Sequence, residues 1–251
     1  MLFALLLTGS SWAANDGMVG KWKLNPSKST LTDQMKVESA GGNKYIFDFG
    51  GGTAETIVAD GSDQAAGYGS TLAVSAEGPR AWKVARKQEG HMLISARWTL
   101  SEDGSTLTDH YTGYRPDGST SSLEYVYKRT AGTSGFAGTW ESVSEKVNSV
   151  YELEIRPGDG DGLAFVTPAQ GMTKNVKFNG KDYPNEGPNL PQGFVSSGRR
   201  IDNSTVELTD KVQGKIIDTQ QIKLADDGKS LTMTVRPVGH TKPNILVFDR
   251  E

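Results

Sequence analysis

The chain has 251 residues, a formal net charge of −3 and an isoelectric point near 5.7, and it contains no cysteine. Because Lys and Arg are not clustered on a basic domain, the composition excludes a nucleic-acid-binding protein, and the absence of cysteine excludes a disulfide scaffold. The 30 glycines and the modest hydrophobic content of 35% indicate short strands joined by frequent turns.

Residues 1–14 have the features of a secretory signal peptide. A short apolar run at 2–7 precedes the small-residue cleavage signal at 11–14, although the usual basic segment before the run is missing. The run is too short to span a bilayer. We therefore expect an exported protein, periplasmic or secreted; the alternative is a disordered apolar tail.

The chain repeats its opening and closing motifs. Gly20-Lys21-Trp22 opens one half and Gly138-Thr139-Trp140 opens the other, and each half closes on an apolar strand that ends in Arg129 or Arg250. A repeat of this length predicts two copies of one small domain. We expect one barrel at 15–130, a second at 138–251, and a short linker at 131–137.

Within each half the hydrophobic pattern has period two. Apolar residues alternate with polar ones at 44–49, 82–85 and 91–100, which places one row of each strand on a buried face. Turn dipeptides such as Asp103-Gly104 and Asp227-Gly228 separate these runs. Many short strands with regular turns predict an antiparallel sandwich or barrel.

The paired motifs resemble those of the lipocalin-like, or calycin, barrels. In that family a Gly-x-Trp lies on the first strand, and an Arg or Lys from the last strand packs over the indole. The resemblance implies an all-β fold of two tandem antiparallel up-and-down barrels. It also implies that Trp22 with Arg129, and Trp140 with Arg250, close the barrel ends, as a guanidinium stacked on an aromatic face can do.

The sequence shows no catalytic motif, and we expect no metal and no cofactor. The three histidines, His91, His110 and His240, are not at metal-ligand spacing. There is no Gly-x-Ser-x-Gly elbow, and no glycine-rich segment opens a helix that would hold a phosphate. The Asp/Gly alternation at 158–162 predicts a tight turn rather than a calcium loop.

The two halves differ at one inward row. The apolar row Met92 to Leu100 aligns with a row in the second half that contains Asp218 and Gln220. A buried carboxylate is costly unless it is paired, so Asp218 should have a partner such as Arg199 or Arg200, or meet solvent or a polar ligand.

A second difference is the proline-rich segment 181–191. Its three prolines predict an irregular loop across a barrel mouth, with Tyr183 as a contact residue. The alternative is a plain surface connection.

These observations predict a non-enzymatic binding protein for a small hydrophobic or amphipathic molecule held in one or both barrels. The residues expected to contact the ligand are Tyr45, Phe47, Trp82, Ile94, Trp98, Tyr183, Asp218 and Gln220. One alternative is a structural or protein-interaction module of the cell envelope with filled barrels. Another is an enzyme that uses Asp218 as acid or base together with Tyr183.

Overall fold

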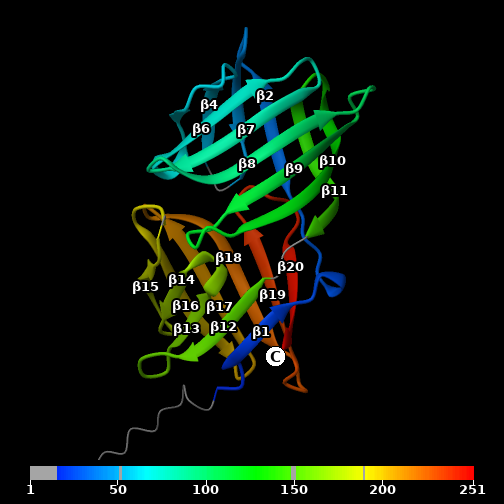
Figure 1. The fold of residues 1–251 in the computed structure, drawn as a ribbon. Coiled ribbons are helices and arrows are strands. Elements are labelled where there is room, and N and C mark those ends of the chain that lie inside the picture. Colours follow the sequence, from blue (N-terminus) through cyan, green and yellow to red (C-terminus); the bar gives the residue numbers. More distant parts are fainter. Residues whose placement is uncertain (1–15, 51–52, 148–150, 189) are drawn as a thin grey trace, which may run out of the picture.

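The computed structural model describes residues 16–50, 53–147, 151–188 and 190–251, and the predicted signal peptide lies outside these ranges. The described chain forms two antiparallel sheets of ten strands, one closed and one nearly closed, stacked one above the other in Figure 1. The all-β prediction of two up-and-down barrels is confirmed. Among the described residues there is no helix of the length and hydrophobicity that a membrane span needs.

The first barrel runs in the order β4-β3-β2-β11-β10-β9-β8-β7-β6-β5. Its strands are β2 (Gln34–Ser39), β3 (Lys44–Asp48), β4 (Ala54–Val58), β5 (Gln64–Ala65), β6 (Ser70–Ala76), β7 (Ala81–Gln88), β8 (His91–Leu100), β9 (Thr106–Tyr114), β10 (Thr120–Ser134) and β11 (Ala137–Val147). The side chain of Gln64 spans the remaining opening by bonding the backbone N–H of Val58 at 2.8 Å and its carbonyl at 2.7 Å.

The second barrel is closed, in the order β1 followed by β12 to β20. Its strands are β1 (Gly20–Leu24), β12 (Glu152–Pro157), β13 (Leu163–Thr167), β14 (Met172–Val176), β15 (Asn179–Glu186), β16 (Phe194–Asp202), β17 (Thr205–Val212), β18 (Lys215–Leu224), β19 (Ser230–Pro237) and β20 (Asn244–Arg250). Short 3₁₀ turns lie at η2 (Pro26–Lys28), η3 (Gly67–Gly69) and η4 (Pro168–Gln170).

The two barrels exchange their opening strands. β1 pairs with β12 and with β20, so the start of the chain completes the second barrel. β11 pairs with β10 and with β2, so the opening strand of the second half completes the first barrel. Figure 1 shows β1, in blue, in the lower barrel beside β20, in red.

The exchange corrects the predicted domain boundaries. Neither 15–130 nor 138–251 is a barrel by itself, because each lacks a strand that the other half supplies. The predicted linker at 131–137 is part of the hairpin between β10 and β11. The chain instead crosses between the barrels along 25–33, and β11 of the first barrel is followed in the sequence by β12 of the second.

The closing motif has the same geometry in both barrels, but its partners are exchanged. Trp22 is fully buried, and the guanidinium of Arg250 lies 4.0 Å from its ring centre. Trp140 is likewise fully buried, with Arg129 at 4.1 Å. The predicted pairs, Trp22 with Arg129 and Trp140 with Arg250, are therefore wrong.

Each tryptophan and arginine is also held by backbone carbonyls. The Trp22 indole N–H donates to Met18 O, and the Arg250 guanidinium donates to the carbonyls of Gly17, Val19 and Gly228. Trp140 and Arg129 make the matching set of bonds in the first barrel. Gly20 is required here because a Cβ would lie 2.6 Å from Arg250 Nη1.

The predicted alternation is present on the strands. On β8, Ala96, Trp98 and Leu100 are buried while Arg97 is exposed. The core of the first barrel is rich in aromatic rings, whereas the core of the second consists mainly of aliphatic side chains. The two scaffolds therefore share a topology but differ in how their interiors are filled.

We expect Trp22→Ala to lower the free energy of unfolding by about 3–5 kcal/mol, the usual loss for a large buried aromatic. Since Trp22 lies in β1, hydrogen exchange should accelerate in β12 and β20 of the second barrel. The exposed Val143→Ala on β11 is the control, with little change expected. Faster exchange confined to β2–β10 would contradict the strand exchange.

We also expect the fragments 16–130 and 138–251 not to unfold cooperatively when purified separately, because each barrel would have unpaired strand edges. Mixing or co-expressing the two fragments should restore a cooperative transition, measured by circular dichroism during urea denaturation. Two fragments that fold independently as monomers would show that the exchange is not needed.

Candidate functional site

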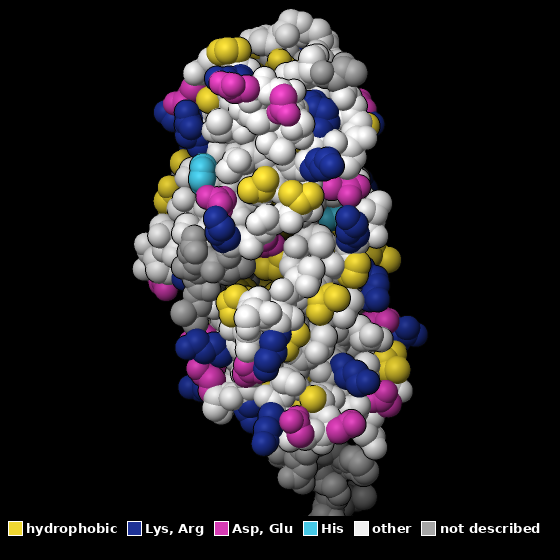
Figure 2. Space-filling model, turned by 90° about the vertical axis from the view of Figure 1, so that its right-hand side faces the viewer, with side chains coloured by type: hydrophobic (Ala, Val, Ile, Leu, Met, Phe, Trp, Pro, Cys, Tyr) yellow, Lys and Arg dark blue, Asp and Glu magenta, His cyan; other side chains and the backbone are white. Residues whose placement is uncertain are grey.

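A cavity of about 800 Å³ occupies the first barrel and reaches the end that faces the second barrel. This volume lies within the range of small-molecule binding sites. Residues of the other barrel and of the crossing segment border it: Leu24, Leu31, Tyr151, Ala169, Gln170, Pro191 and Leu246. Figure 2 shows a hollow at mid-height of the molecule, with hydrophobic side chains inside it.

One part of the cavity wall is apolar. Ile94, Ala96 and Trp98 on β8 point into it, and side chains from neighbouring strands complete the surface: Met35, Phe49, Leu72, Val84, Leu93 and Leu123. Of the residues predicted to contact a ligand in this barrel, Ile94 and Trp98 therefore line the cavity.

The other three predicted aromatic residues do not line the cavity. Trp82 stacks on Phe136 with ring centres 3.9 Å apart, and Tyr45 packs edge-on against Trp82 at 4.8 Å. Phe47 is fully buried between these rings and Trp98. Tyr45, Phe47 and Trp82 thus form part of the packed core, and their predicted role as lining residues is wrong.

A buried carboxyl faces Trp98 inside the barrel. Asp109 on β9 is the direct cross-strand neighbour of Trp98, and the two residues are only 6% and 3% exposed. Asp109 Oδ1 and the Trp98 indole N–H both lack a well-aligned hydrogen bond. Burial raises the pKa of Asp109 to about 7, with the charge of Asp33 adding to the shift and the nearby indole N–H opposing it.

A second carboxyl, Asp33, enters the cavity from the crossing segment. Its Oδ2 accepts a hydrogen bond of 2.5 Å from the hydroxyl of Tyr127, which is 1% exposed. Burial raises the pKa of Asp33, while Tyr127 and His240 act in the opposite direction. Sequence reasoning missed Asp33, because no strand pattern marks a residue in a connecting segment.

A third carboxyl, Glu145 on β11, lies beside Tyr125. Both of its oxygens are buried without a well-aligned partner. Burial raises the pKa of Glu145 to about 7, the Tyr125 hydroxyl opposes this shift, and Asp33 adds to it. Burial likewise raises the pKa of Tyr111 to about 12, with Asp109 and Asp33 contributing. Tyr111, Tyr125 and Tyr127 all line the cavity, which therefore has an end where carboxyls and tyrosines gather.

A separate charged pair on the cavity wall is fully matched. Arg86 on β7 binds both oxygens of Glu55, at 2.9 and 2.7 Å, and also donates to Ser70 Oγ. Glu55 accepts a further bond from the backbone N–H of Gly67. The Arg86 guanidinium is therefore already paired with the Glu55 carboxylate and hydrogen-bonded to Ser70.

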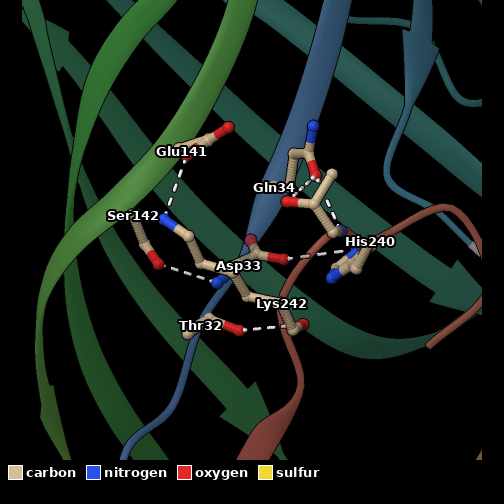
Figure 3. Close-up of a pocket in the computed structure, with 8 residues that line it drawn as sticks. Thr32, Asp33, Gln34, Glu141, Ser142, His240 and Lys242 are labelled. Atoms are coloured by element: carbon tan, nitrogen blue, oxygen red, sulfur yellow. Dashed lines mark hydrogen bonds and ion pairs between the residues drawn. The ribbon is translucent and has the colours of Figure 1, made fainter. Parts of the chain in front are cut away.

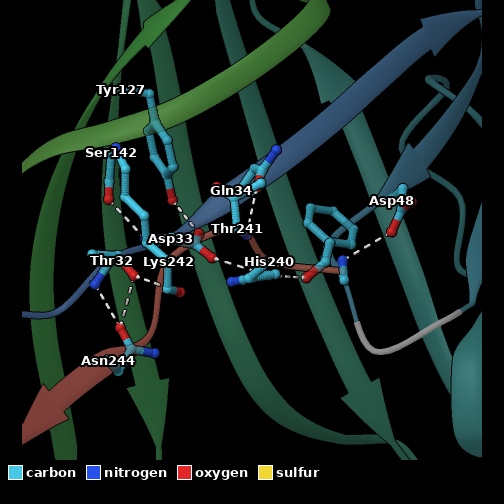
Figure 4. A network of polar contacts seen from close by, with 12 residues as sticks. Thr32, Asp33, Gln34, Asp48, Tyr127, Ser142, His240, Thr241, Lys242 and Asn244 are labelled. Atoms are coloured by element: carbon cyan, nitrogen blue, oxygen red, sulfur yellow. Dashed lines mark hydrogen bonds and ion pairs between the residues drawn. The ribbon is translucent and has the colours of Figure 1, made fainter. Parts of the chain in front are cut away.

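The junction between the barrels holds Asp33 in place. His240, on the turn between β19 and β20, is bonded through Nε2 to Phe49 O at 3.1 Å and lies 3.9 Å from Asp33 Oδ1 (Figure 4). The backbone N–H of Asp33 donates to Ser142 Oγ at 2.7 Å (Figure 3). Further bonds join Thr32 to Asn244, Gln34 to Thr241 and Glu141 to Lys242. The small void at this junction, about 10 Å³, has room for no more than one water molecule.

In the second barrel, Asp218 and Gln220 face inward as the alternation predicts. Gln220 donates to Asp218 Oδ1 and to Asp210 Oδ2, each at 2.9 Å. Asp210 is also bound by Lys174 and Ser196. Burial, together with the charge of Asp210, raises the pKa of Asp218 to about 6.

The partner suggested for Asp218 was wrong. Arg199 pairs with Glu207 at 2.7 Å and Arg200 pairs with Asp16 at 2.6 Å. The polar groups around Asp218 are therefore joined to one another within the barrel.

The predicted loop around Tyr183 is mostly a strand. Residues up to Glu186 belong to β15, where Tyr183 pairs with Ser196 and its hydroxyl accepts a 2.8 Å bond from Asn179. Among the described residues of this segment, Pro191 alone borders the cavity. Tyr183 and Asp218 belong to separate hydrogen-bonded groups, and the structure does not bring them together as a catalytic pair.

Asp109 could have been found from the sequence. Leu107, Asp109 and Tyr111 form an inward row on β9 with the same period as the row on β8. Within the described part of the chain, no three His, Cys, Asp or Glu side chains are grouped so that they could hold a metal ion.

We expect stability to fall as the pH rises from about 4 to about 7. The folded protein keeps the Asp109 proton up to a pKa of about 7, whereas the unfolded chain loses it near 3.8, so the folded state binds more protons in this window. In the Asp109→Asn variant this decline should be smaller, measured by urea denaturation at about pH 5 and about pH 8.

The exposed Asp103, whose pKa hydrogen bonds from Ser101 and Ser105 lower to about 2, supplies the control. Asp103→Asn should leave the slope between these two pH values unchanged. An unaltered slope in Asp109→Asn would show that Asp109 does not titrate in this range.

Comparison with known proteins gives no assignment. No family model matches the chain, and no curated protein matches it significantly.

Proposed function

We propose that the protein is a non-enzymatic binding protein that holds a small, partly apolar molecule in the first barrel. The observation that carries this proposal is the cavity of about 800 Å³ with an apolar wall and a polar end. Solid packing is the usual state of a protein interior, so a space of this size is not required by the fold itself.

The arrangement of groups around the cavity supports the same proposal. The wall formed by Phe49, Ile94 and Trp98 offers apolar contact surface, while Asp109 Oδ1 and the Trp98 indole N–H lack well-aligned partners. Binding sites combine these features, because apolar walls supply affinity and a few polar groups fix orientation.

In this proposal the barrels are of the lipocalin-like type, and the repeated Gly-x-Trp with its stacked arginine closes each one. The second barrel serves as the support of the first and borders the cavity's open end through residues such as Tyr151 and Leu246. Residues 1–14 would direct the protein to the periplasm or to the outside of the cell.

The test uses N-phenyl-1-naphthylamine, an apolar fluorescent probe that is uncharged at neutral pH. It should bind the folded protein with one high-affinity site, detected by energy transfer from tryptophan. Ala96→Trp, which fills the cavity from β8, should weaken this binding by about tenfold or more, the equivalent of about 1.4 kcal/mol.

Ile201→Trp is the matched control, because Ile201 is exposed on the second barrel and the probe should bind this variant as it does the original protein. Circular dichroism would show that both variants are folded. Absence of probe binding, or equal binding to Ala96→Trp, would contradict the proposal.

A further inference from the structure

We propose that the ligand of the first barrel carries a protonated amine, which is bound by the carboxyls of Asp109 and Asp33 at the tyrosine-lined end of the cavity. This inference rests on the proposed binding function and specifies the chemical class of the ligand.

The first step of the argument is an imbalance of charge. Asp33 and Asp109 line the cavity, Glu145 lies beside the lining residue Tyr125, and Asp33 acts electrostatically on both of the other carboxyls. Among the described residues, neither Asp109 nor Glu145 has a cationic side chain as a partner. Several carboxyls gathered in a buried site repel one another when ionised, which makes a cation the complementary ligand group.

Each cationic side chain near the cavity already has a hydrogen-bonding partner within the chain. Arg86 is bound by both oxygens of Glu55. Arg115 borders the cavity beyond the end of β9, six residues from Asp109 along the chain, and donates to the neutral Ser119 Oγ. His240 contacts Phe49 O and lies 3.9 Å from Asp33, on the junction side of that carboxyl. None of these groups is placed to neutralise Asp109.

The second step is the unpartnered oxygen of Asp109. Asp109 is only 6% exposed, it lines the cavity, and its Oδ1 has no well-aligned hydrogen bond, although the Trp98 indole N–H lies near enough to lower the pKa of this carboxyl. An ammonium group placed there would donate to Oδ1, while the ionised carboxyl could then draw a bond from the adjacent Trp98 indole N–H. Both unpartnered groups would be satisfied by one ligand charge.

The third step is the aromatic surround. Tyr111, Tyr125, Tyr127 and Trp98 line the same part of the cavity as these carboxyls. Aromatic faces attract cations, most strongly where water is excluded. The apolar wall around Ile94 and Phe49 would then hold the body of the amine.

Binding of an amine should depend on pH in a defined direction. Below about pH 7 Asp109 carries a proton and offers no charge, so affinity should rise as the pH increases through this value. The titratable or charged groups around this region are Asp33, Asp109, Tyr111, Tyr125, Tyr127, His240, Arg115, the Glu55–Arg86 pair and, beside Tyr125, Glu145.

The experiment compares three probes of nearly equal size by isothermal titration calorimetry: 1-naphthylmethylamine, 1-naphthalenemethanol and 1-naphthoate. At about pH 8 the amine should bind about tenfold or more tightly than the alcohol, because a charge-assisted bond replaces a neutral one, and the anionic 1-naphthoate should bind weakest. At about pH 5.5 the advantage of the amine should shrink.

Asp109→Asn should remove most of the amine's advantage over the alcohol at about pH 8, so that the two affinities differ by no more than about twofold. Asp218→Asn, in the second barrel, is the matched control and should keep the preference for the amine. Circular dichroism would show that both variants are folded.

The outcomes separate this inference from the proposed function. Equal binding of amine and alcohol by the unaltered protein, or tighter binding of the naphthoate, would overturn the amine proposal and leave a binding cavity in place. If neither these probes nor N-phenyl-1-naphthylamine bound, the proposed function itself would fail.

Discussion

Closure of two barrels by exchanged strands is the constraint on which the rest of the structure depends. β1 lies between β12 and β20, so its loss would leave two strand edges with unpaired backbone groups in the second barrel. The exchange forces the chain to cross between the barrels along 25–33 and keeps them in contact. It thereby places Asp33 at the end of the first barrel and brings Leu24 and Tyr151 to the border of the same cavity. The candidate site is therefore a product of both barrels and not of one repeat alone.

The sequence was sufficient to predict the strands, the repeat and the closing residues, because alternation and turn dipeptides are local signals. It was not sufficient to predict which copy each closing tryptophan joins. Trp22 and Trp140 make the same two contacts, a stacked guanidinium and an indole N–H bonded to a carbonyl four residues earlier. Either arginine would satisfy either tryptophan, so the motif contains no information about the partner. Only the long-range pairing of β1 with β20 decides it.

The difference between local signals and long-range packing also explains which site residues the sequence predicted correctly. Alternation predicts that a side chain faces inward, and this was correct for Ile94, Trp98 and Gln220. It does not predict whether an inward side chain meets open space or another ring, and Trp82 is covered by Phe136 at 3.9 Å. That contact depends on how distant strands curve toward one another, which one strand's pattern does not contain.

The two barrels share a topology but differ in the partners that they give to their buried carboxyls. On the aligned strands, the first barrel has apolar Ile94 and Ala96 on β8 and places Asp109 on β9, while the second has Asp218 and Gln220 on β18 and Met233 on β19. In the second barrel Lys174 supplies the cation, and Asp210 and Gln220 connect the remaining groups. The described residues of the first barrel supply no such cation to Asp109 or Glu145, and burial disfavours their charged forms. Since the second barrel pairs Asp210 with Lys174 and hydrogen-bonds Asp218 to Gln220, carboxyls without well-aligned partners are not a requirement of this topology. Their presence beside a cavity points to a partner that the chain itself does not contain.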